Sequence, residues 1–402
     1  MANSLSQIGA VTAMNVRNIP ERWASSLVAV VGIGGVTLVL VAVLSIAAGF
    51  KKALELSGSP DVAVVLRNGA TNEMSSGFGL DQTTIIADAP GVKRDAKNRP
   101  LSSAELYVLA EGHLKNKEAD ANQANMPVRG ISPAAPQLRK SFKIVKGRMM
   151  KEGTNEVIVG NGIIANYEGV GIGQKARWGN TDWVIVGQFT DDGGVAESEV
   201  WADAHYVQQV WNRGSSYQSV RVRLADDSEA TFKKFKDSLT KDPRIQVAVE
   251  REPEFYAEQQ AIMATLINVA GWTFAVMMGL AAIFAAVNTM FNAVASRVRE
   301  IATLRAMGFG AAPVTFSVLA EALLLGGVGG LLGGLLALVF LNGMQSSTMN
   351  FQTFSQITYA FTVTPGLMLT GVVYGLVLTF IAGLIPGIIA ARKPITTGLR
   401  EL

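Results

Sequence analysis

Charged residues are absent from three long stretches of this sequence, and that distribution constrains the fold more than any other feature. Asp, Glu, Lys and Arg are missing from residues 23–50, 259–296 and 322–391, which are 28, 38 and 70 residues long. All 67 charged residues fall on the other 266, at the density usual for soluble domains. The chain therefore combines membrane-like and soluble parts. This excludes a purely soluble enzyme, a disordered protein, a collagen-like fibre and a disulfide-stapled secreted module.

The three charge-free stretches predict four membrane-spanning helices. Residues 25–50 exceed the roughly 20 residues that cross a bilayer, and they are far longer than the apolar core of a signal peptide. The second stretch is longer than one span, and residues 254–260 before it contain no helix breaker, so this helix is expected to begin outside the membrane. Residues 51–56 are similarly compatible with an extension of the first helix. The third stretch holds two spans, at 313–343 and 363–391.

The basic pI, near 9.0, does not indicate a nucleic-acid partner, because the excess of positive charge forms no groove. Residues 51–258 carry 27 basic and 28 acidic residues, whereas the rest of the chain carries 8 and 4. That excess borders the apolar stretches, at 297–305 and near the C-terminus, and is missing from 344–359. The positive-inside rule then places both termini and residues 297–312 in the cytoplasm, and residues 51–258 outside.

Residues 51–258 have the composition of a soluble α/β domain. Short β-rich runs alternate with turn signals such as Asn68-Gly69, and residues 231–239 have the apolar spacing of an amphipathic helix. Strands are predicted at 61–67, 104–110, 156–159, 182–189 and 219–224. The predicted fold class is an integral membrane α-helical protein with four transmembrane helices and a large α/β extracytoplasmic domain inserted between helices 1 and 2.

Few residues offer catalytic or metal-binding chemistry. The sequence has no cysteine, and its two histidines, His113 and His205, stand in no metal-binding spacing. It also lacks the G-x-x-x-x-G-K-[ST] phosphate loop and the G-x-S-x-G nucleophile motif. The chain is therefore not expected to be an enzyme, to bind a metal or to hydrolyse ATP by itself.

Residues 296–310 predict a short amphipathic helix between the second and third spans. Such a helix exposes its charged residues, turns its apolar residues toward a partner surface and ends at Gly308, a glycine suited to a C-cap. The exposed residues are expected to be Arg297, Glu300 and Arg305, and the partner-facing ones Ile301, Leu304 and Met307. The alternative is an ordinary positively charged loop at the cytoplasmic face, and the residues alone favour neither.

Glu321 lies about eight residues into the third predicted span, where a carboxylate is expensive. Such an acid indicates either a function or a structural pair with an arginine near the inner interface. A single isolated acid makes no proton relay, so the pair is favoured.

The third span also contains six glycines between residues 326 and 334. They form overlapping small-xxx-small pairs, Gly326/Gly330, Gly329/Gly333 and Gly330/Gly334, and such pairs let helix backbones approach closely. The pattern predicts tight packing of this span against its neighbours.

The order of these elements resembles that of the MacB-type permeases of ABC transporters, a group that includes FtsX-like and lipoprotein-releasing permeases. The family has one span, a large extracytoplasmic domain and three more spans with a basic loop between the second and third. Residues 288–310 and 320–334 resemble the family's coupling loop and its acid-then-glycine third span. Residues 386–402 resemble its tail, and Lys146-Gly147-Arg148 with the residues that follow resembles its periplasmic core.

The resemblance implies the permease subunit of a MacB-like, type VII ABC transporter. A separate ATPase subunit binds ATP and Mg²⁺ and docks on the coupling loop, and its motion is passed to the outer domain for export across the cell envelope (mechanotransmission). The alternatives are a lipoprotein-releasing permease and an FtsX-like regulator or scaffold of envelope enzymes that transports nothing. The substrate stays open, because the family handles antibiotics, peptides, lipids and lipoproteins.

Partners and site residues follow from the same resemblance. The chain itself is expected to hold no cofactor. Its expected partners are the ATPase, a second permease copy or sister permease, and the lipid bilayer of the bacterial inner membrane; Gram-negative relatives add a periplasmic adaptor and an outer-membrane exit duct. The implied ATPase-coupling residues are Arg297, Arg299, Glu300, Ile301, Leu304, Arg305 and Gly308, and the transmembrane packing residues are Glu321, Gly326, Gly330 and Gly334.

These assignments predict the domain boundaries. The segments are a cytoplasmic amphipathic segment (1–24), the first span (25–50), the extracytoplasmic domain (51–258) with a flanking subdomain (57–128 and 216–253) and an inserted subdomain (129–215), a stalk with the second span (259–296), the coupling loop (297–312), the third span (313–343), a short outer loop (344–362), the fourth span (363–391) and a cytoplasmic tail (392–402).

Overall fold

The computed structural model divides the chain into two compact units. The first, here called the helical unit, comprises residues 1–48, 266–344 and 361–402; the second, here called the α/β unit, comprises residues 49–265 and 345–360. The structure describes residues 8, 9, 12–14, 17, 23–115, 123–295, 297–349, 356–392 and 394. Most of the predicted amphipathic segment (1–24) and of the predicted tail (392–402) therefore lies outside the described residues.

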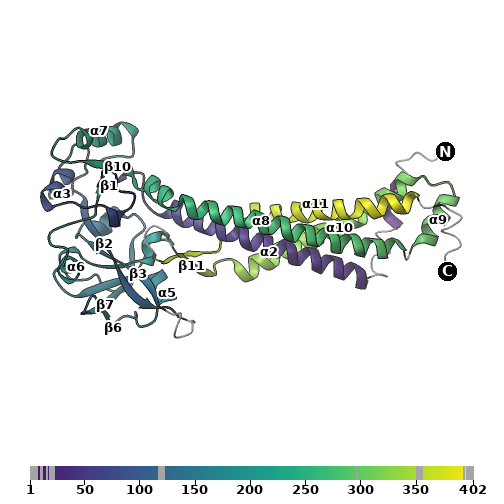
Figure 1. The fold of residues 1–402 in the computed structure, drawn as a ribbon, viewed down its shortest axis with the longest axis horizontal. Coiled ribbons are helices and arrows are strands. Elements are labelled where there is room, and N and C mark those ends of the chain that lie inside the picture. Colours follow the sequence, from purple (N-terminus) through teal and green to yellow (C-terminus); the bar gives the residue numbers. More distant parts are fainter. Residues whose placement is uncertain are drawn as a thin grey trace. The chain divides into compact units, whose positions relative to one another are not determined.

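Four long helices confirm the four predicted spans (Figure 1). They are α2 (Trp23–Leu56), α8 (Glu252–Ala295), α10 (Ala311–Leu341) and α11 (Pro365–Arg392). Each contains a stretch long and apolar enough to cross a membrane. The predicted extensions are also confirmed, because α8 begins at Glu252 and α2 continues to Leu56.

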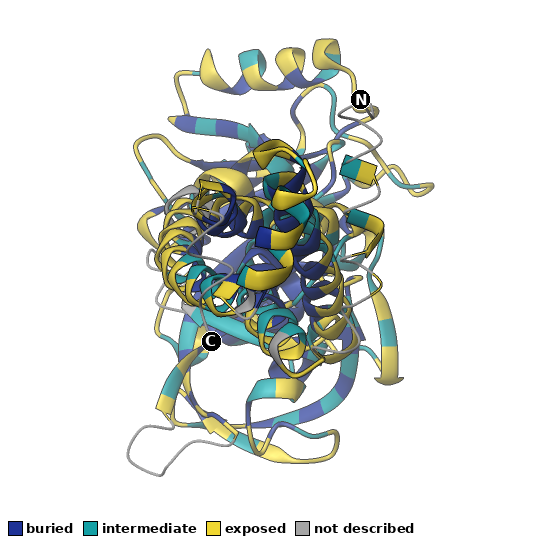
Figure 2. Cartoon of the chain, turned by 90° about the vertical axis from the view of Figure 1, so that its right-hand side faces the viewer, coloured by how far each residue is buried: buried dark blue, intermediate teal, exposed yellow. Residues whose placement is uncertain are grey.

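The helical unit buries one face of each long helix and leaves the other face exposed (Figure 2). Large apolar side chains lie on the exposed faces. Phe284 of α8 is 76% exposed and Val339 of α10 is 73% exposed. Apolar surface of this extent is unfavourable in water and is suited to lipid. The fold class predicted from the charge-free stretches is therefore confirmed.

The α/β unit is built on one mixed sheet, which has ten strands in the described part of the chain. Its strands follow the order β10-β1-β9-β2-β3-β8-β5-β7-β4, with β6 paired to β7. Neighbours are antiparallel except β3 with β8 and β5 with β7. The strands are β1 (Val62–Arg67), β2 (Ser102–His113), β3 (Gln123–Ile131), β4 (Lys143–Gly147), β5 (Glu156–Gly160), β6 (Lys175–Trp178), β7 (Thr181–Thr190), β8 (Val200–Asp203), β9 (Ser219–Arg223) and β10 (Val247–Arg251).

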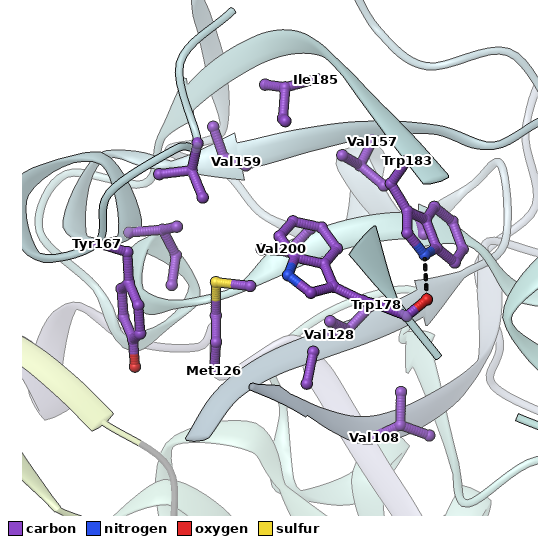
Figure 3. Close-up of a cluster of buried hydrophobic side chains, with 14 of the residues drawn as sticks. Val108, Met126, Val128, Val157, Val159, Tyr167, Trp178, Trp183, Ile185 and Val200 are labelled. Carbon is purple, nitrogen blue, oxygen red and sulfur yellow. Dashed lines mark hydrogen bonds between the residues drawn. The ribbon is translucent and has the colours of Figure 1, made fainter. Parts of the chain in front are cut away.

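Of three apolar cores along this sheet in the described residues, the two larger ones define its two halves. One packs β1, β9 and β10 against α3 (Leu80–Ala87) and α7 (Glu229–Thr240). The other packs β2, β3, β5, β7 and β8 with α5 (Asn161–Asn166) and α6 (Ala204–Val210), and Trp183 Nε1 donates there to the Trp178 carbonyl at 3.1 Å (Figure 3). Strand β2 joins the two halves, because its residues 102–105 pair with β9 and its residues 106–113 pair with β3.

The strands predicted at 61–67, 104–110, 156–159, 182–189 and 219–224 are confirmed as β1, β2, β5, β7 and β9, and the predicted helix is confirmed as α7. The predicted boundary between the flanking and inserted subdomains, at 128/129, falls inside β3. Strand β3 pairs with β2 on one side and with β8 on the other, so both sides of the predicted boundary lie in the same half of the sheet, and sequence patterns give no sign of this.

The segment between the third and fourth spans is a β-hairpin, where the sequence predicts only a short loop. Strands β11 (Gln345–Met349) and β12 (Gln356–Ala360) are antiparallel and belong to the α/β unit. Thr358 N donates to Ser198 Oγ at 2.8 Å, and Asn166 Nδ2 donates to Thr358 Oγ1 at 2.8 Å. These bonds fasten the hairpin to α5 and to the short helix η4 (Val195–Ser198).

Candidate functional site

The predicted coupling segment forms a helix, α9 (Val298–Ala306), within the helical unit. Its C-terminus is closed by a Schellman motif, in which Gly308 N donates to the Arg305 carbonyl and Phe309 N donates to the Leu304 carbonyl, both at 3.1 Å. Gly308 has a φ of +96°, a conformation that costs other residues about 1–2 kcal/mol. The predicted glycine cap is therefore confirmed, and it gives α9 a defined end.

Arg297 precedes α9 and anchors it to the third span. Its Nη1 donates to Glu321 Oε2 of α10 at 2.6 Å, and its Nε lies 3.7 Å from Glu300 Oε2. The expectation that Arg297 is exposed is wrong, because its residue surface is only 4% exposed. The carboxylate inside α10 attracts the guanidinium inward, since a buried charge needs a partner. The predicted pair of Glu321 with an arginine near the inner interface is therefore made by Arg297, a residue that the sequence does not single out as its partner.

The two faces of α9 differ. Ile301 packs against the chain's own Val294, Val318 and Ala390, although the sequence predicts that it turns toward a partner. Leu304 and Arg305 are half-buried. The opposite face exposes Arg299, Glu300, Thr303 and Met307, and Met307 is 64% exposed. One face of α9 is therefore fixed to α8, α10 and α11, and the other is open.

Glycines of α10 let the backbones of α2 and α11 approach it. A Cβ added at Gly333 would collide with the Gly34 carbonyl oxygen of α2, and one added at Gly330 would lie 2.9 Å from Val372 Cα of α11. At Gly326 an added Cβ would collide with the side chain of Thr379. At Gly334 it would meet Met368 only at 3.8 Å, an ordinary contact. The tight packing lies at residues 326, 330 and 333 more than at 334.

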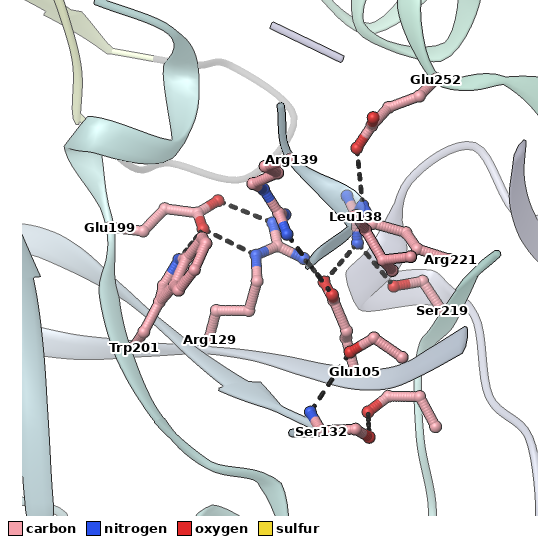
Figure 4. A network of polar contacts seen from close by, with 12 residues as sticks. Glu105, Arg129, Ser132, Leu138, Arg139, Glu199, Trp201, Ser219, Arg221 and Glu252 are labelled. Atoms are coloured by element: carbon pink, nitrogen blue, oxygen red, sulfur yellow. Dashed lines mark hydrogen bonds and ion pairs between the residues drawn. The ribbon is translucent and has the colours of Figure 1, made fainter. Parts of the chain in front are cut away.

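The α/β unit contains a buried charge network that joins its sheet to the start of α8 (Figure 4). We use this name for Glu73, Glu105, Arg129, Glu199, Arg221 and Glu252. Arg129 of β3 donates five hydrogen bonds of 2.7–3.0 Å to Glu73, Glu105 and Glu199. Arg221 of β9 donates to Glu105 at 2.6 Å, to Glu73 at 2.9 Å and to Glu252 at 3.2 Å.

Glu252 connects this network to α8, because it is the first residue of that helix. Its Oε2 accepts from Ser59 N at 3.1 Å, just after α2 ends. Burial alone would raise the pKa of Glu73, but the Arg129 and Arg221 guanidinium groups hold the pKa of this carboxyl well below its usual range. The Glu73 carboxyl is therefore ionised, and α8 is tied to the sheet by the hydrogen bonds that Glu252 accepts from Arg221 and Ser59.

No group of three His, Asp or Glu residues that could hold a metal ion occurs within the ranges that the structure describes.

Two family models match the chain. The model of the MacB-like periplasmic core domain matches residues 26–240, more than half of the chain, and the FtsX-like permease C-terminal model matches residues 272–395. The chain belongs to the MacB/FtsX-type permease family. It is therefore an integral membrane permease of the type VII ABC transporters.

Solved structures give more distant similarities to this permease. The periplasmic region of MacB from Actinobacillus actinomycetemcomitans is 15% identical, with a TM-score of 0.37, over 52% of this chain and 95% of that one. The extracellular domain of the noncanonic ABC-type transporter YknZ from Gram-positive bacteria is 14% identical, with a TM-score of 0.35, over 47% of this chain and all of that one. Among curated proteins, none matches.

Sequence reasoning found α9 of this permease but missed the buried charge network. Members that share a hydrogen bond lie up to 148 residues apart along the chain, as Glu73 and Arg221 do, so no local motif marks them. The available signal is the run Ser219–Arg223, in which Arg221 alternates with valines. Alternation normally places the polar residue in solvent, but Arg221, Val220 and Val222 are all buried, because this sheet is covered on both faces.

The stability of the α/β unit depends on pH through Asp191. Burial raises the pKa of Asp191 to about 6, and Glu252, Glu197 and Glu199 add to that rise while Arg139 opposes it. A raised carboxyl pKa means that the folded state keeps its proton longer than the unfolded state. Stability is therefore lost as pH rises from about 4 through 6.

We predict that Asp191→Asn raises the free energy of unfolding by about 2–3 kcal/mol above pH 7 and changes it little at pH 4, because the shift of roughly two pKa units is worth about 1.4 kcal/mol each. Urea unfolding of the full chain in mild detergent, followed by tryptophan fluorescence, measures both values. A gain that is the same at both pH values would contradict this account of Asp191.

Proposed function

We propose that this permease is the membrane subunit of an ATP-driven transporter and that a separate ATPase chain docks on α9. The proposal rests on the difference between the two faces of this helix: one is packed against the helical unit and the other is exposed. Arg297 and Ile301 hold one face against the helical unit, and Arg299, Thr303 and Met307, four residues apart, expose the other. A partner that binds the open face therefore moves the ends of α8 and α10 with it.

Helix α8 supports a mechanical role for this contact. It is one helix of 44 residues, Glu252–Ala295, which is about 66 Å at 1.5 Å per residue. Its last residues adjoin α9, and its first residue accepts hydrogen bonds from the sheet. We infer that closure of the ATPase displaces α9 and that α8 passes this displacement to the α/β unit. ATP and Mg²⁺ belong to the ATPase, and the chain supplies positioning and force transfer.

The rest of the proposed assembly follows the same scheme. Two permease copies, or this chain and a sister permease, bind two ATPases at the cytoplasmic face of the bacterial inner membrane. Both termini are cytoplasmic and the α/β unit is extracytoplasmic, as the distribution of basic residues favours. There the α/β unit acts on a substrate for export across the envelope, through an adaptor and an outer-membrane duct where the cell has them.

Affinity purification of the chain from its own cell, in mild detergent and with mass spectrometry of the recovered proteins, tests this proposal. Recovery of a P-loop ATPase in equal amount is the expected result. Reproducible absence of an ATPase, in detergents that preserve related complexes, would overturn the proposal. Recovery of an envelope hydrolase in its place would favour the regulator, and recovery of lipoproteins with the ATPase would favour lipoprotein release.

We predict that Glu300→Lys and Met307→Asp each reduce recovery of the ATPase at least tenfold, because each places a new charge in the open face of α9. Quantitative mass spectrometry of the purified complexes measures the effect. Lys233→Glu, an exposed charge reversal on α7, is the control and should leave recovery unchanged. Wild-type recovery with both α9 variants would assign the docking surface elsewhere.

A further inference from the structure

A cavity of about 300 Å³ lies where α8, α9 and α11 meet, within the helical unit. Nine of its ten lining residues are apolar, among them Phe291 and Val294 of α8, Ala302 of α9 and Ile389 of α11. The tenth is Arg305 of α9. The volume is about twice that of an apolar cavity of roughly 150 Å³ that holds benzene. It therefore has room for part of a hydrocarbon chain.

The cavity lies at the level where the spans end. The apolar span of α8 ends at Asn292, and that of α11 ends at Arg392. The lining residues run from 291 to 298 on the α8 side and from 389 to 394 on the α11 side, so they straddle both ends. The apolar interior of a bilayer meets its polar headgroups at such a boundary.

The charge around the cavity is positive. Arg305 forms part of its wall, and Arg392 is exposed between the lining residues Ala390 and Pro394. Among the described residues nearby, Glu300 lies 3.7 Å from Arg297 and lines a separate small cavity with it, and Glu321 accepts a hydrogen bond from Arg297 at 2.6 Å. An apolar chamber with a cationic wall matches a molecule that has a hydrocarbon body and an anionic head.

We infer that this cavity binds one anionic phospholipid, with part of an acyl chain between α8, α9 and α11 and its phosphate at Arg305. A soluble anion has no apolar surface to pack against the nine apolar residues, and a neutral apolar molecule has no charged group to interact with the arginine. Basic pockets between helices at the cytoplasmic side are known to bind anionic lipid heads. The bound lipid braces α9 against α8 and α11. The inference rests on the proposed cytoplasmic position of α9 and is independent of ATPase docking.

Native mass spectrometry of the purified full chain, without an ATPase, tests this site. The chain is incubated with mixed micelles of phosphatidylglycerol or of phosphatidylcholine with the same acyl chains. We expect one retained phosphatidylglycerol per chain and at least tenfold less retained phosphatidylcholine. Equal retention of the two lipids would overturn the inference.

Three variants locate the lipid. Arg305→Gln should lower retention of phosphatidylglycerol at least tenfold, and Arg305→Lys should restore most of it. Arg299→Gln, an exposed charge on the same helix that does not line the cavity, should leave retention unchanged. Loss with Arg299→Gln equal to that with Arg305→Gln would show only a general attraction to positive charge and would overturn the site.

A filled cavity gives a second, independent readout. Ala302→Leu occupies part of the volume and should lower retention of phosphatidylglycerol while the melting temperature of the chain shows that it is folded. If residues 395–402 occupied the cavity, the wild-type chain would retain no lipid and a chain without these residues would retain it, which would also overturn the inference. Because the ATPase is absent throughout, failure here leaves the proposed docking on α9 untouched.

Discussion

Arg129→Leu is expected to destabilise the α/β unit by about 3–5 kcal/mol. Arg129 is 1% exposed, and its guanidinium donates hydrogen bonds to three carboxylates, Glu73, Glu105 and Glu199. Leucine leaves the buried Glu199 carboxylate without its arginine and leaves Arg221 as the network's remaining arginine for Glu73 and Glu105. Removing one partner of a buried ion pair costs about this much. Since whole domains are stable by only about 5–15 kcal/mol, this is a large part of the stability of the unit.

Urea unfolding of the full chain in mild detergent measures this effect, because tryptophans of the α/β unit such as Trp183 and Trp201 report on its folding. The control is Arg148→Leu, which removes an arginine that donates two hydrogen bonds to one carboxylate at the surface. Arg148 donates to Glu156 at 2.6 and 2.5 Å, but its side chain is 49% exposed. Water and counterions replace such a pair, so little stability is lost. Equal losses in the two variants would show that burial of the network is not what makes Arg129 important.

Gly333→Leu is expected to separate α10 from α2. A Cβ at residue 333 already collides with the Gly34 carbonyl oxygen and would lie 2.9 Å from Thr37 Cβ, so the larger leucine side chain cannot be placed without moving a backbone. Overpacking typically costs about 1–3 kcal/mol and more when a backbone must shift. We expect Gly333→Ala to lose about 1–3 kcal/mol and Gly333→Leu to lose more than 3 kcal/mol.

The neighbouring glycine supplies a matched control. Gly334 lies on the same helix, and an added Cβ there meets Met368 at 3.8 Å. Gly334→Ala should therefore not lower the melting temperature in detergent, because it causes no clash and because alanine is more favourable than glycine in a helix interior. If Gly333→Ala and Gly334→Ala melted at the same temperature, close backbone approach at residue 333 would not limit the packing of this bundle.

Most of the fold could be predicted from the sequence because its strongest signals are local. Stretches without charge mark the spans, and β-branched runs mark β1, β5, β7 and β9. Gly308 marks the end of α9, because few other residues adopt its positive φ at low cost. Each of these signals comes from residues close together in the chain, so it can be recognised in a single sequence.

The parts that could not be predicted depend on contacts between distant residues. The hairpin at residues 345–360 is fastened by Asn166 and Ser198, which are more than 150 residues away in the chain. The residues next to Arg297 in the sequence predict an exposed position, and its burial follows from its ion pair with Glu321. The buried charge network likewise gathers acids and arginines that, read singly, are indistinguishable from the surface charges of a soluble domain.

Hydrogen exchange of the purified complex, with and without ATP, measures whether a displacement of α9 reaches the α/β unit. We expect ATP to change exchange on α9 and also in the α/β unit, at the start of α8 (252–256) and in segment 191–198, where Val195 N donates to Ser57 Oγ. Arg221 and Glu252 connect the sheet to α8, so a displacement of α8 must reach them. A change confined to α9, with the α/β unit unaffected by ATP, would contradict the transfer of motion along α8.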